Sequence, residues 1–286
     1  MTERWEFELG VAQLGASPLV ATAIHDGHAL RHSLQPKMAL DDAERLREED
    51  PHTARWLALS DTWVRIVRSR FEVDLNRPPD KCVYRTPADA WGLRVWRAPL
   101  DDVDVRESLR AYHAFYAQMH ALLEHLCARF GGFVLYDLHS YNHRRRGAGV
   151  PASPAQLAPE INVGTGSLDA RRWGHVVDTF QERLRWHDFL GRALDVRENV
   201  NFRGGHLSRW VHEHFGDRGC ALAVEVKKFF MDEWSGRVDE RLLVEVGHAL
   251  KATTGPVLDA ALPPLRGRLG PIDAALHRSA ARPHGR

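Results

Sequence analysis

Two histidines, each at the end of a short apolar run, are the first candidates for chemistry. His25 follows the run 19–24, and His139 lies in the polar stretch that ends the run beginning at 133. Apolar runs of this length are typical of buried strands, and in open α/β sheets ligands bind outside the carboxyl ends of the strands. Imidazole is the commonest metal ligand, so we predict a metal held between neighbouring strand ends. The alternative for either ring is a histidine hydrogen-bonded within a loop.

A metal held by these histidines needs a further ligand, and an acidic cluster can supply it. A catalytic zinc usually takes three protein ligands from His, Asp and Glu and leaves a position for water. Glu48, Glu49 and Asp50 are consecutive, and Pro51 directly after them favours a break in a helix at this point. We expect a carboxylate of this cluster to be the third ligand. Histidine and carboxylate ligands suit several divalent metals, so zinc is the expected ion but not the required one.

Glu225 is a candidate of a different kind, because it stands in the middle of an apolar stretch. The stretch 221–230 is expected to form a strand, in which an unpaired carboxylate is costly to bury. One interpretation is simple alternation, with Val224 and Val226 facing inward and Glu225 facing outward beside Lys227. The other is a general base directed at a metal-activated water, with its pKa tuned by the site.

Two further segments of the chain contain arginines. The segment 71–75 alternates in polarity as a strand does, and Asn76, Arg77 and two prolines follow it. Arginine binds carboxylates through two parallel hydrogen bonds, so Arg77 could fix an acidic substrate; the alternative is an arginine exposed at the surface. The arginines 144–146 begin a stretch rich in Gly, Pro and Ala, residues 144–159, which we expect to be a solvated loop.

Composition and charge exclude several classes of function. The 39 basic and 38 acidic side chains give a net charge of +1, so no bulk field attracts nucleic acid or a membrane surface. Cys82, Cys127 and Cys220 form no Cys-x-x-Cys pair, which is typical of a reducing compartment rather than of a disulfide framework. The first residues lack the layout of a signal peptide, and no apolar run approaches the ~18–20 residues of a membrane span. We therefore expect a cytoplasmic protein and leave its oligomeric state open.

The order of the expected elements indicates an α/β fold, because strands alternate with long helices. Apolar side chains at alternating steps of three and four predict an amphipathic helix over 105–130, which two glycines end. A second helical pattern covers 56–67, and 71–75 is expected to be a strand. A chain of this length can bury a large core. We expect one domain over 1–262 and a loose tail rich in Pro and Arg over 263–286.

These candidates belong to a set of motifs that resembles the N-formylglutamate amidohydrolase family, relatives of the zinc carboxypeptidases. The resemblance covers roughly His25 to Glu233, and its most specific parts are the Asp-Leu-Asn-Arg-Pro block and the Leu-His-Ser ending. The motifs in chain order are Pro18, His25-Asp-Gly, Glu49-Asp50-Pro51-His-Thr, Val73-Asp-Leu-Asn-Arg-Pro-Pro-Asp80, Asp137-Leu-His-Ser140, Asn162-Val-Gly-Thr165, Gly204-Gly205 and Glu225-Val-Lys-Lys-Phe-Phe-Met-Asp-Glu233.

The resemblance implies a three-layer α/β/α sandwich with a mixed central sheet, like that of zinc carboxypeptidases and phosphorylase-hydrolase-like proteins. It also implies one Zn²⁺ per chain and the hydrolysis of a small amide. His25 and His139 would be zinc ligands, and Asp50 is favoured over Glu49 as the third, because Asp50 holds the aspartate position of the family's acidic motif. Glu225 would be the base that activates the attacking water and then passes the proton to the leaving amine.

The resemblance implies substrate contacts as well. Arg77, with Asn76, would hold the substrate carboxylate, as an Asn-Arg pair does in carboxypeptidases, and Ser140 is a further substrate-binding candidate. The chain departs from the family at 25–27, where deformylases commonly have His-Ser-Gly, and at 48–52, where the family's Asp-Thr-Asp-Trp-His is replaced by Glu-Glu-Asp-Pro-His. We therefore expect an N-formyl or N-acyl amino acid as the substrate. The alternatives are a carboxypeptidase-like peptidase acting on a small peptide, or a non-catalytic binding protein with the same pocket.

Overall fold

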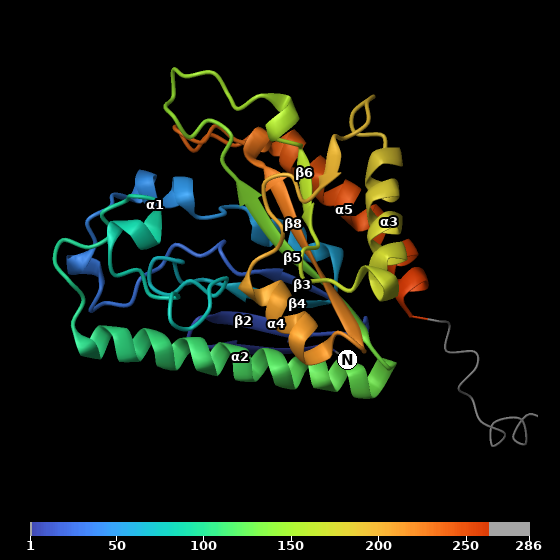
Figure 1. Ribbon diagram of the computed structural model, residues 1–286, viewed down its shortest axis with the longest axis horizontal. Helices are drawn as coiled ribbons and strands as arrows, with labels where there is room; N and C mark the ends of the chain where they lie inside the picture. Colours follow the sequence, from blue (N-terminus) through green and yellow to red (C-terminus); the bar gives the residue numbers. More distant parts are fainter. Residues whose placement is uncertain (1, 263–286) are drawn as a thin grey trace, which may run out of the picture.

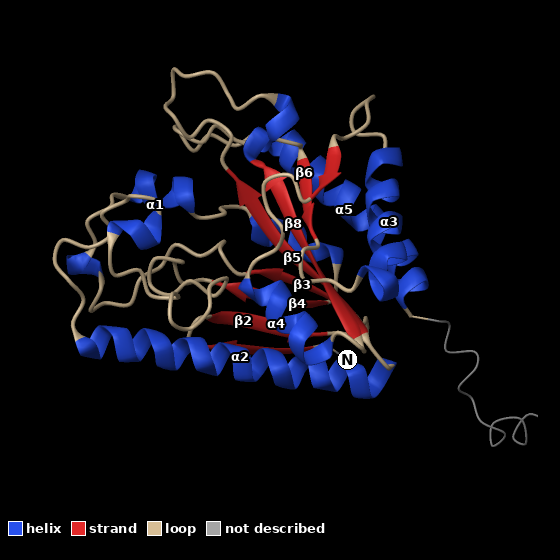
Figure 2. Ribbon diagram, in the orientation of Figure 1, coloured by secondary structure: helices blue, strands red, loops and turns tan. Residues whose placement is uncertain are grey.

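The computed structural model describes residues 2–262, so the predicted tail over 263–286 lies outside the described residues. A sheet of eight strands in the order β1-β2-β4-β3-β5-β8-β6-β7 forms the centre, and helices cover both of its faces (Figures 1 and 2). The strands are β1 Glu3–Phe7, β2 Gly10–Leu14, β3 Leu19–Ala23, β4 Thr62–Ile66, β5 Phe133–Tyr141, β6 Ile161–Gly164, β7 Val196–Glu198 and β8 Gly219–Lys227. The helices are α1 Asp42–Glu48, α2 Asp102–Phe130, α3 Ala170–Trp186, α4 His206–Phe215 and α5 Glu240–Ala261.

The four central strands, β4, β3, β5 and β8, run parallel to one another. At one edge β1 and β2 form an antiparallel hairpin, and β2 pairs antiparallel with β4. At the other edge β6 runs antiparallel to β8 and parallel to β7. The sheet is therefore mixed, as expected. Parallel neighbours end at the same edge, so the carboxyl ends of β3, β5 and β8 lie together and can carry one site.

Alternating side chains of the strands supply two separate cores, which makes the fold a three-layer α/β/α sandwich and confirms the expected class. In β5, Val134, Tyr136 and Leu138 pack with residues of α3 and α5 on one face. Phe133 and Leu135 point to the opposite face, where α2 and α4 cover the sheet (Figure 1). This division follows from the period of two in strands, in which successive side chains point to opposite faces.

The long helix expected over 105–130 is confirmed as α2, which begins at Asp102 and ends at Phe130. Asp101 caps its first turn by accepting hydrogen bonds from two backbone N–H groups. Gly131 ends it with a φ of 82°, a left-handed conformation that glycine adopts without a steric penalty. No helix within residues 2–262 is long and apolar enough to cross a membrane.

Two predicted elements are wrong. The helix expected over 56–67 is a short 3₁₀ helix, Thr53–Leu59, followed by the strand β4. The strand expected over 71–75 is irregular chain, whose alternating polar residues face buried partners rather than solvent. In addition, β5 does not end where the polar residues begin, because the strand continues as far as Tyr141. His139 therefore lies within a strand and not in the loop after it.

Candidate metal centre

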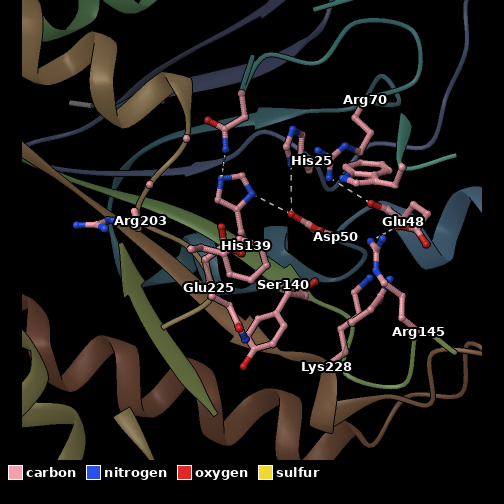
Figure 3. A pocket seen from close by; sticks show the side chains of 18 residues that line it. His25, Glu48, Asp50, Arg70, His139, Ser140, Arg145, Arg203, Glu225 and Lys228 are labelled. Carbon is pink, nitrogen blue, oxygen red and sulfur yellow. Dashed lines mark hydrogen bonds and ion pairs between the residues drawn. The ribbon is translucent and has the colours of Figure 1, made fainter. Parts of the chain in front are cut away.

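Three buried side chains converge near the carboxyl ends of the central strands: His25, Asp50 and His139 (Figure 3). His25 follows β3, Asp50 follows α1, and His139 lies in β5, the neighbour of β3 in the sheet. The Nδ1 atoms of His25 and His139 lie 3.5 and 2.9 Å from one oxygen atom, Oδ2 of Asp50. One donor atom from each residue lies within 4.8 Å of the others, a separation that a single metal ion can bridge.

A second carboxylate faces the other nitrogen of each imidazole. Nε2 of His25 lies 2.8 Å from Oδ1 of Asp74, and Nε2 of His139 lies 3.0 Å from Oδ2 of Asp137. Thr22 of β3 donates a hydrogen bond of 2.8 Å to the remaining oxygen of Asp137. The hydrogen bond of 2.8 Å between His25 and Asp74 favours the tautomer of His25 with a proton on Nε2, which directs the lone pair of its Nδ1 toward Asp50. Asp137 contacts Nε2 of His139 as an ion pair and fixes that ring from the same side. Carboxylates orient the histidine ligands of metal sites in the same way.

Asp74 is itself held by basic and hydroxyl groups. Arg70 donates to its Oδ2 at 2.9 Å, and the hydroxyl of Tyr84 donates to the same oxygen. Burial favours the neutral acid, but Arg70 and His25 outweigh it and hold the pKa of Asp74 well below its usual range. Asp74 is therefore an ionised carboxylate at neutral pH, and it can fix the ring of His25.

The donor set fits a divalent cation. Each of the two rings lies between two carboxylates, an arrangement that favours a cation between the two Nδ1 atoms and Asp50. Although burial opposes the charged ring, Asp137 and Glu225 raise the pKa of His139 well above its ordinary value. Two imidazole nitrogens and one carboxylate oxygen are a donor set that suits zinc.

Glu225 lies beside this cluster on the neighbouring strand. It pairs directly with His139 in the register of β5 and β8, so the two side chains project from the same face of the sheet. The alternation expected at this point is present, since Val224 and Val226 face the core under α3 and α5. Glu225, however, is buried at the pocket instead of facing solvent, and burial raises its pKa to about 7. A carboxyl group with this pKa can accept and release a proton near neutral pH, as a general base must.

The structure brings Asp50, and not Glu49, to the histidines. The chain is extended at Glu49, and its carboxylate turns to His28 at 2.6 Å and to the hydroxyl of Ser69. The backbone N–H of Asp50 donates to the carbonyl of His25 at 2.9 Å, which ties the two residues together. The buried ammonium group of Lys228 donates to two carbonyls at the end of α1 and so fixes the chain just before Asp50.

Two of the three expected substrate-binding residues line the pocket. Asn76 Nδ2 lies 3.3 Å from Nε2 of His139, and Asn76 Oδ1 accepts from the N–H of Leu207 at the start of α4. Ser140 has a buried hydroxyl without a hydrogen-bond partner among the described residues. The structure does not bring Arg77 to the pocket wall. Its guanidinium instead lies 5.0 Å from the ring centroid of Tyr84, and its Nε atom lies 3.5 Å from Oδ2 of Asp74.

The pocket has a volume of about 480 Å³, and part of its wall comes from residues to which the sequence assigned no role. Arg70, Arg145, Arg203 and Lys228 are the basic side chains among these, and Glu48 is acidic (Figure 3). Arg145 belongs to the stretch expected to be a solvated loop. The position of Asp137 could be predicted from the sequence, because a residue two positions before His139 in a strand projects from the same face of the sheet. The contacts of Lys228 could not be predicted in this way, because its partners are distant in the chain.

Comparisons with known proteins identify a family and two solved structures with a similar fold. The model of the N-formylglutamate amidohydrolase family matches residues 17–231. The crystal structure of an N-formylglutamate amidohydrolase from Ralstonia eutropha JMP134 is similar with a TM-score of 0.65 and 18% identity, over 86% of this chain and 94% of that one. A gene product from Agrobacterium tumefaciens gives a TM-score of 0.61 and 17% identity, over 85% of this chain and 91% of that one. Likeness at this identity shows the fold. The comparison with curated proteins finds no match.

Proposed function

Because the chain belongs to the N-formylglutamate amidohydrolase family, we propose that it is a zinc-dependent hydrolase that cleaves the amide bond of an N-formyl or N-acyl amino acid. The observation that carries the proposal is Glu225, with its pKa near 7, beside the cluster of His25, Asp50 and His139. A protein that only bound a ligand through a metal would have no use for a base at this position. The pocket of about 480 Å³ is of the size that small-molecule sites have.

The residues of the cluster would divide the work of holding the ion. His25 Nδ1, His139 Nδ1 and Asp50 would be its ligands, and Asp74 and Asp137 would orient the two rings. A bound zinc ion would supply a Lewis acid that polarises the scissile carbonyl and makes water more acidic.

Glu225 would carry the proton through the reaction. Its ionised carboxylate accepts a proton from the attacking water while the water oxygen adds to the carbonyl carbon. The resulting acid then gives this proton to the nitrogen of the leaving amine, so that the amide bond breaks and the carboxylate is restored. A pKa near 7 suits both directions of transfer. The unpartnered hydroxyl of Ser140 is available to a polar group of the substrate.

The metal is tested first. Protein purified without added zinc is expected to hold about one zinc ion per chain, and His139→Ala is expected to lose it, because the site loses one of its three ligands. Elemental analysis measures both. If the unchanged chain binds no metal even after zinc is supplied, the proposed function is wrong.

Hydrolysis is tested with a panel of N-formyl and N-acetyl amino acids, and with small peptides for the carboxypeptidase-like alternative. Glu225→Gln is expected to keep the metal and to lower kcat by about 10²–10⁴-fold, the usual contribution of general acid–base catalysis. Glu182→Gln, on the exposed side of α3, is the matched control and should leave kcat unchanged. A Glu225→Gln variant with normal kcat would show that another group moves the proton.

We also propose a cytoplasmic location. Cys82, Cys127 and Cys220 are all free and buried, and burial raises the pKa of each thiol. Free, buried cysteines of this kind are typical of proteins in a reducing compartment. Thiol titration of protein released gently from cells, with and without denaturant, would find three reactive groups only after unfolding.

A further inference from the structure

Arg145 is a basic side chain in the pocket wall for which the proposed reaction has so far no use. It lies in the loop after β5, and its Nη2 atom donates to the carboxylate of Glu48 (Figure 3). Its guanidinium also lies 5.4 Å from the ring centroid of Trp91, within the range of a cation–π contact. The side chain is 49% exposed, so the guanidinium is accessible to a molecule that enters the pocket.

Glu48 fixes this guanidinium from one side. Glu48 is the last residue of α1, two positions before Asp50, and its side chain is only 7% exposed. A carboxylate with so little exposure needs a charged partner, and Arg145 provides it. The guanidinium has five N–H donors in a planar fork, and the bond to Glu48 uses its Nη2 group. The remaining donors can bind a second carboxylate without breaking the ion pair.

The backbone before Arg145 is fixed as well. The buried carboxylate of Glu233 accepts hydrogen bonds from the N–H groups of His143 and Arg144, at 2.6 and 3.0 Å. The indole N–H of Trp234 donates to the carbonyl of Arg144 at 3.0 Å. The start of this loop is thus anchored next to β5, and Arg145 needs little ordering when a ligand binds. Such preorganisation increases affinity.

The other basic side chains in the wall have different tasks. Arg70 is committed to Asp74, with a hydrogen bond of 2.9 Å. Lys228 donates to two backbone carbonyls at 2.7 Å each. Figure 3 shows the guanidinium of Arg203 directed away from the metal ligands. Within the described part of the chain, Arg145 is therefore the pocket arginine best placed to bind an anionic group of the substrate.

We propose that Arg145 determines specificity by binding the substrate carboxylate, and that Glu48 is the residue that positions it. The proposal rests on the proposed function, which places an N-acyl amino acid in this pocket. Its carboxylate would meet Arg145 while its amide lies at the histidine cluster. Amides that lack a free carboxylate would then be poor substrates, because they leave the guanidinium without this partner.

Binding without turnover tests the proposal. The zinc-loaded full chain with Glu225→Gln is titrated calorimetrically with N-acetylglycine, N-acetylalanine and N-acetylglutamate, and with the matching amino-acid amides. Adding Arg145→Gln is expected to weaken binding of the acids by about 10–100-fold, the value of a charged hydrogen bond, and to leave binding of the amides unchanged. Arg146→Gln changes the next arginine of the same loop, which is exposed, and should alter neither. Equal binding of the acids with and without Arg145, or no binding of any acid, overturns the proposal.

Further variants separate positioning from folding and from the reaction itself. Arg145→Lys keeps the charge but loses the planar fork, so it is expected to restore only part of the preference for acids. Glu48→Gln keeps the shape and removes the charge of the positioning residue, and is expected to weaken acid binding less than Arg145→Gln does. Normal thermal unfolding of each variant excludes a folding defect. If acid binding depends on Arg145 but the unchanged chain hydrolyses no amide, the proposed function fails and the carboxylate site remains.

Discussion

Replacing Asp137 with asparagine tests how the candidate metal ligands are oriented. Asp137 lies in β5 two positions before His139, and its Oδ2 faces Nε2 of that ring at 3.0 Å. Thr22 donates to the other oxygen at 2.8 Å and fixes the plane of the carboxylate. Asparagine has nearly the same shape and can turn its oxygen to His139 and its amide nitrogen to the hydroxyl of Thr22. The substitution therefore removes the charge and leaves the packing nearly unchanged.

The size of the effect follows from this change of a charged contact into a neutral one. Hydrogen bonds to charged groups contribute roughly 1.5–3 kcal/mol, and neutral ones roughly 0.5–1.5 kcal/mol. Asp137 is fully buried, so solvent does not screen the difference. A loss of about 1.4 kcal/mol is a factor of about ten in affinity. We expect the zinc Kd of Asp137→Asn to rise about tenfold and that of Asp137→Ala to rise more, within the roughly 10–100-fold range of such partners.

Competition with a fluorescent zinc chelator, on protein stripped of metal, measures these constants. Asp178→Asn, on the exposed side of α3, is the control for a lost carboxylate far from the site and should bind zinc normally. Circular dichroism of the metal-free proteins checks that each variant is folded. If folded Asp137→Asn binds zinc as tightly as the unchanged chain, the carboxylate does not orient His139 and the reasoning is refuted.

Two further predictions concern the stability of the fold. A Cβ atom at Gly205 would lie 2.1–2.3 Å from side-chain atoms of Asn76, so Gly205→Ala should lower the free energy of unfolding in urea by about 1–3 kcal/mol. Gly174→Ala in α3, where a Cβ meets no atom within 4 Å, should not be destabilising, and equal losses in both would contradict the clash. Burial lowers the pKa of His212 from 6.5 to about 4, so its contribution is complete above pH 6.5 and is lost as the pH falls toward 4. At about 1.36 kcal/mol per pKa unit the loss is at most about 3 kcal/mol. His212→Gln should show a correspondingly smaller fall in urea stability between these pH values, and an identical fall would refute the assignment.

The elements that were predicted correctly are those whose signal is local. The helix α2 has a regular apolar stripe and a glycine at its end, and β3 is a short apolar run, so neither depends on distant contacts. The helix expected over 56–67 failed because two patterns adjoin there. The apolar residues of a 3₁₀ helix lead directly into β4, where Thr62, Val64 and Ile66 alternate with more exposed residues at a period of two.

The sequence predicts the parts of the site that depend on the order of the strands. It does not predict the parts that depend on which distant side chains contact each other. His25 and His139 are placed by β3 and β5, which are neighbours in the sheet. Asp50 rather than Glu49 contacts the histidines because the Glu49 carboxylate is hydrogen-bonded to His28. This hydrogen bond joins segments that are far apart in the chain. The positions of arginines were equally hidden, because a long side chain can turn either toward the pocket or toward aromatic rings beside it.

The strand β5 shows why core and site cannot vary independently. Phe133 and Leu135 pack under α2 and α4, and on the same face Asp137 and His139 continue the row into the pocket. In the opposite row, Val134, Tyr136 and Leu138 pack under α3 and α5. A shift of β5 by one residue would send Leu138 into the pocket and the charged residues into the core. The apolar residues on both faces thus stabilise the one register in which His139 stands opposite Glu225, so the hydrophobic core itself holds the candidate ligand and the candidate base together.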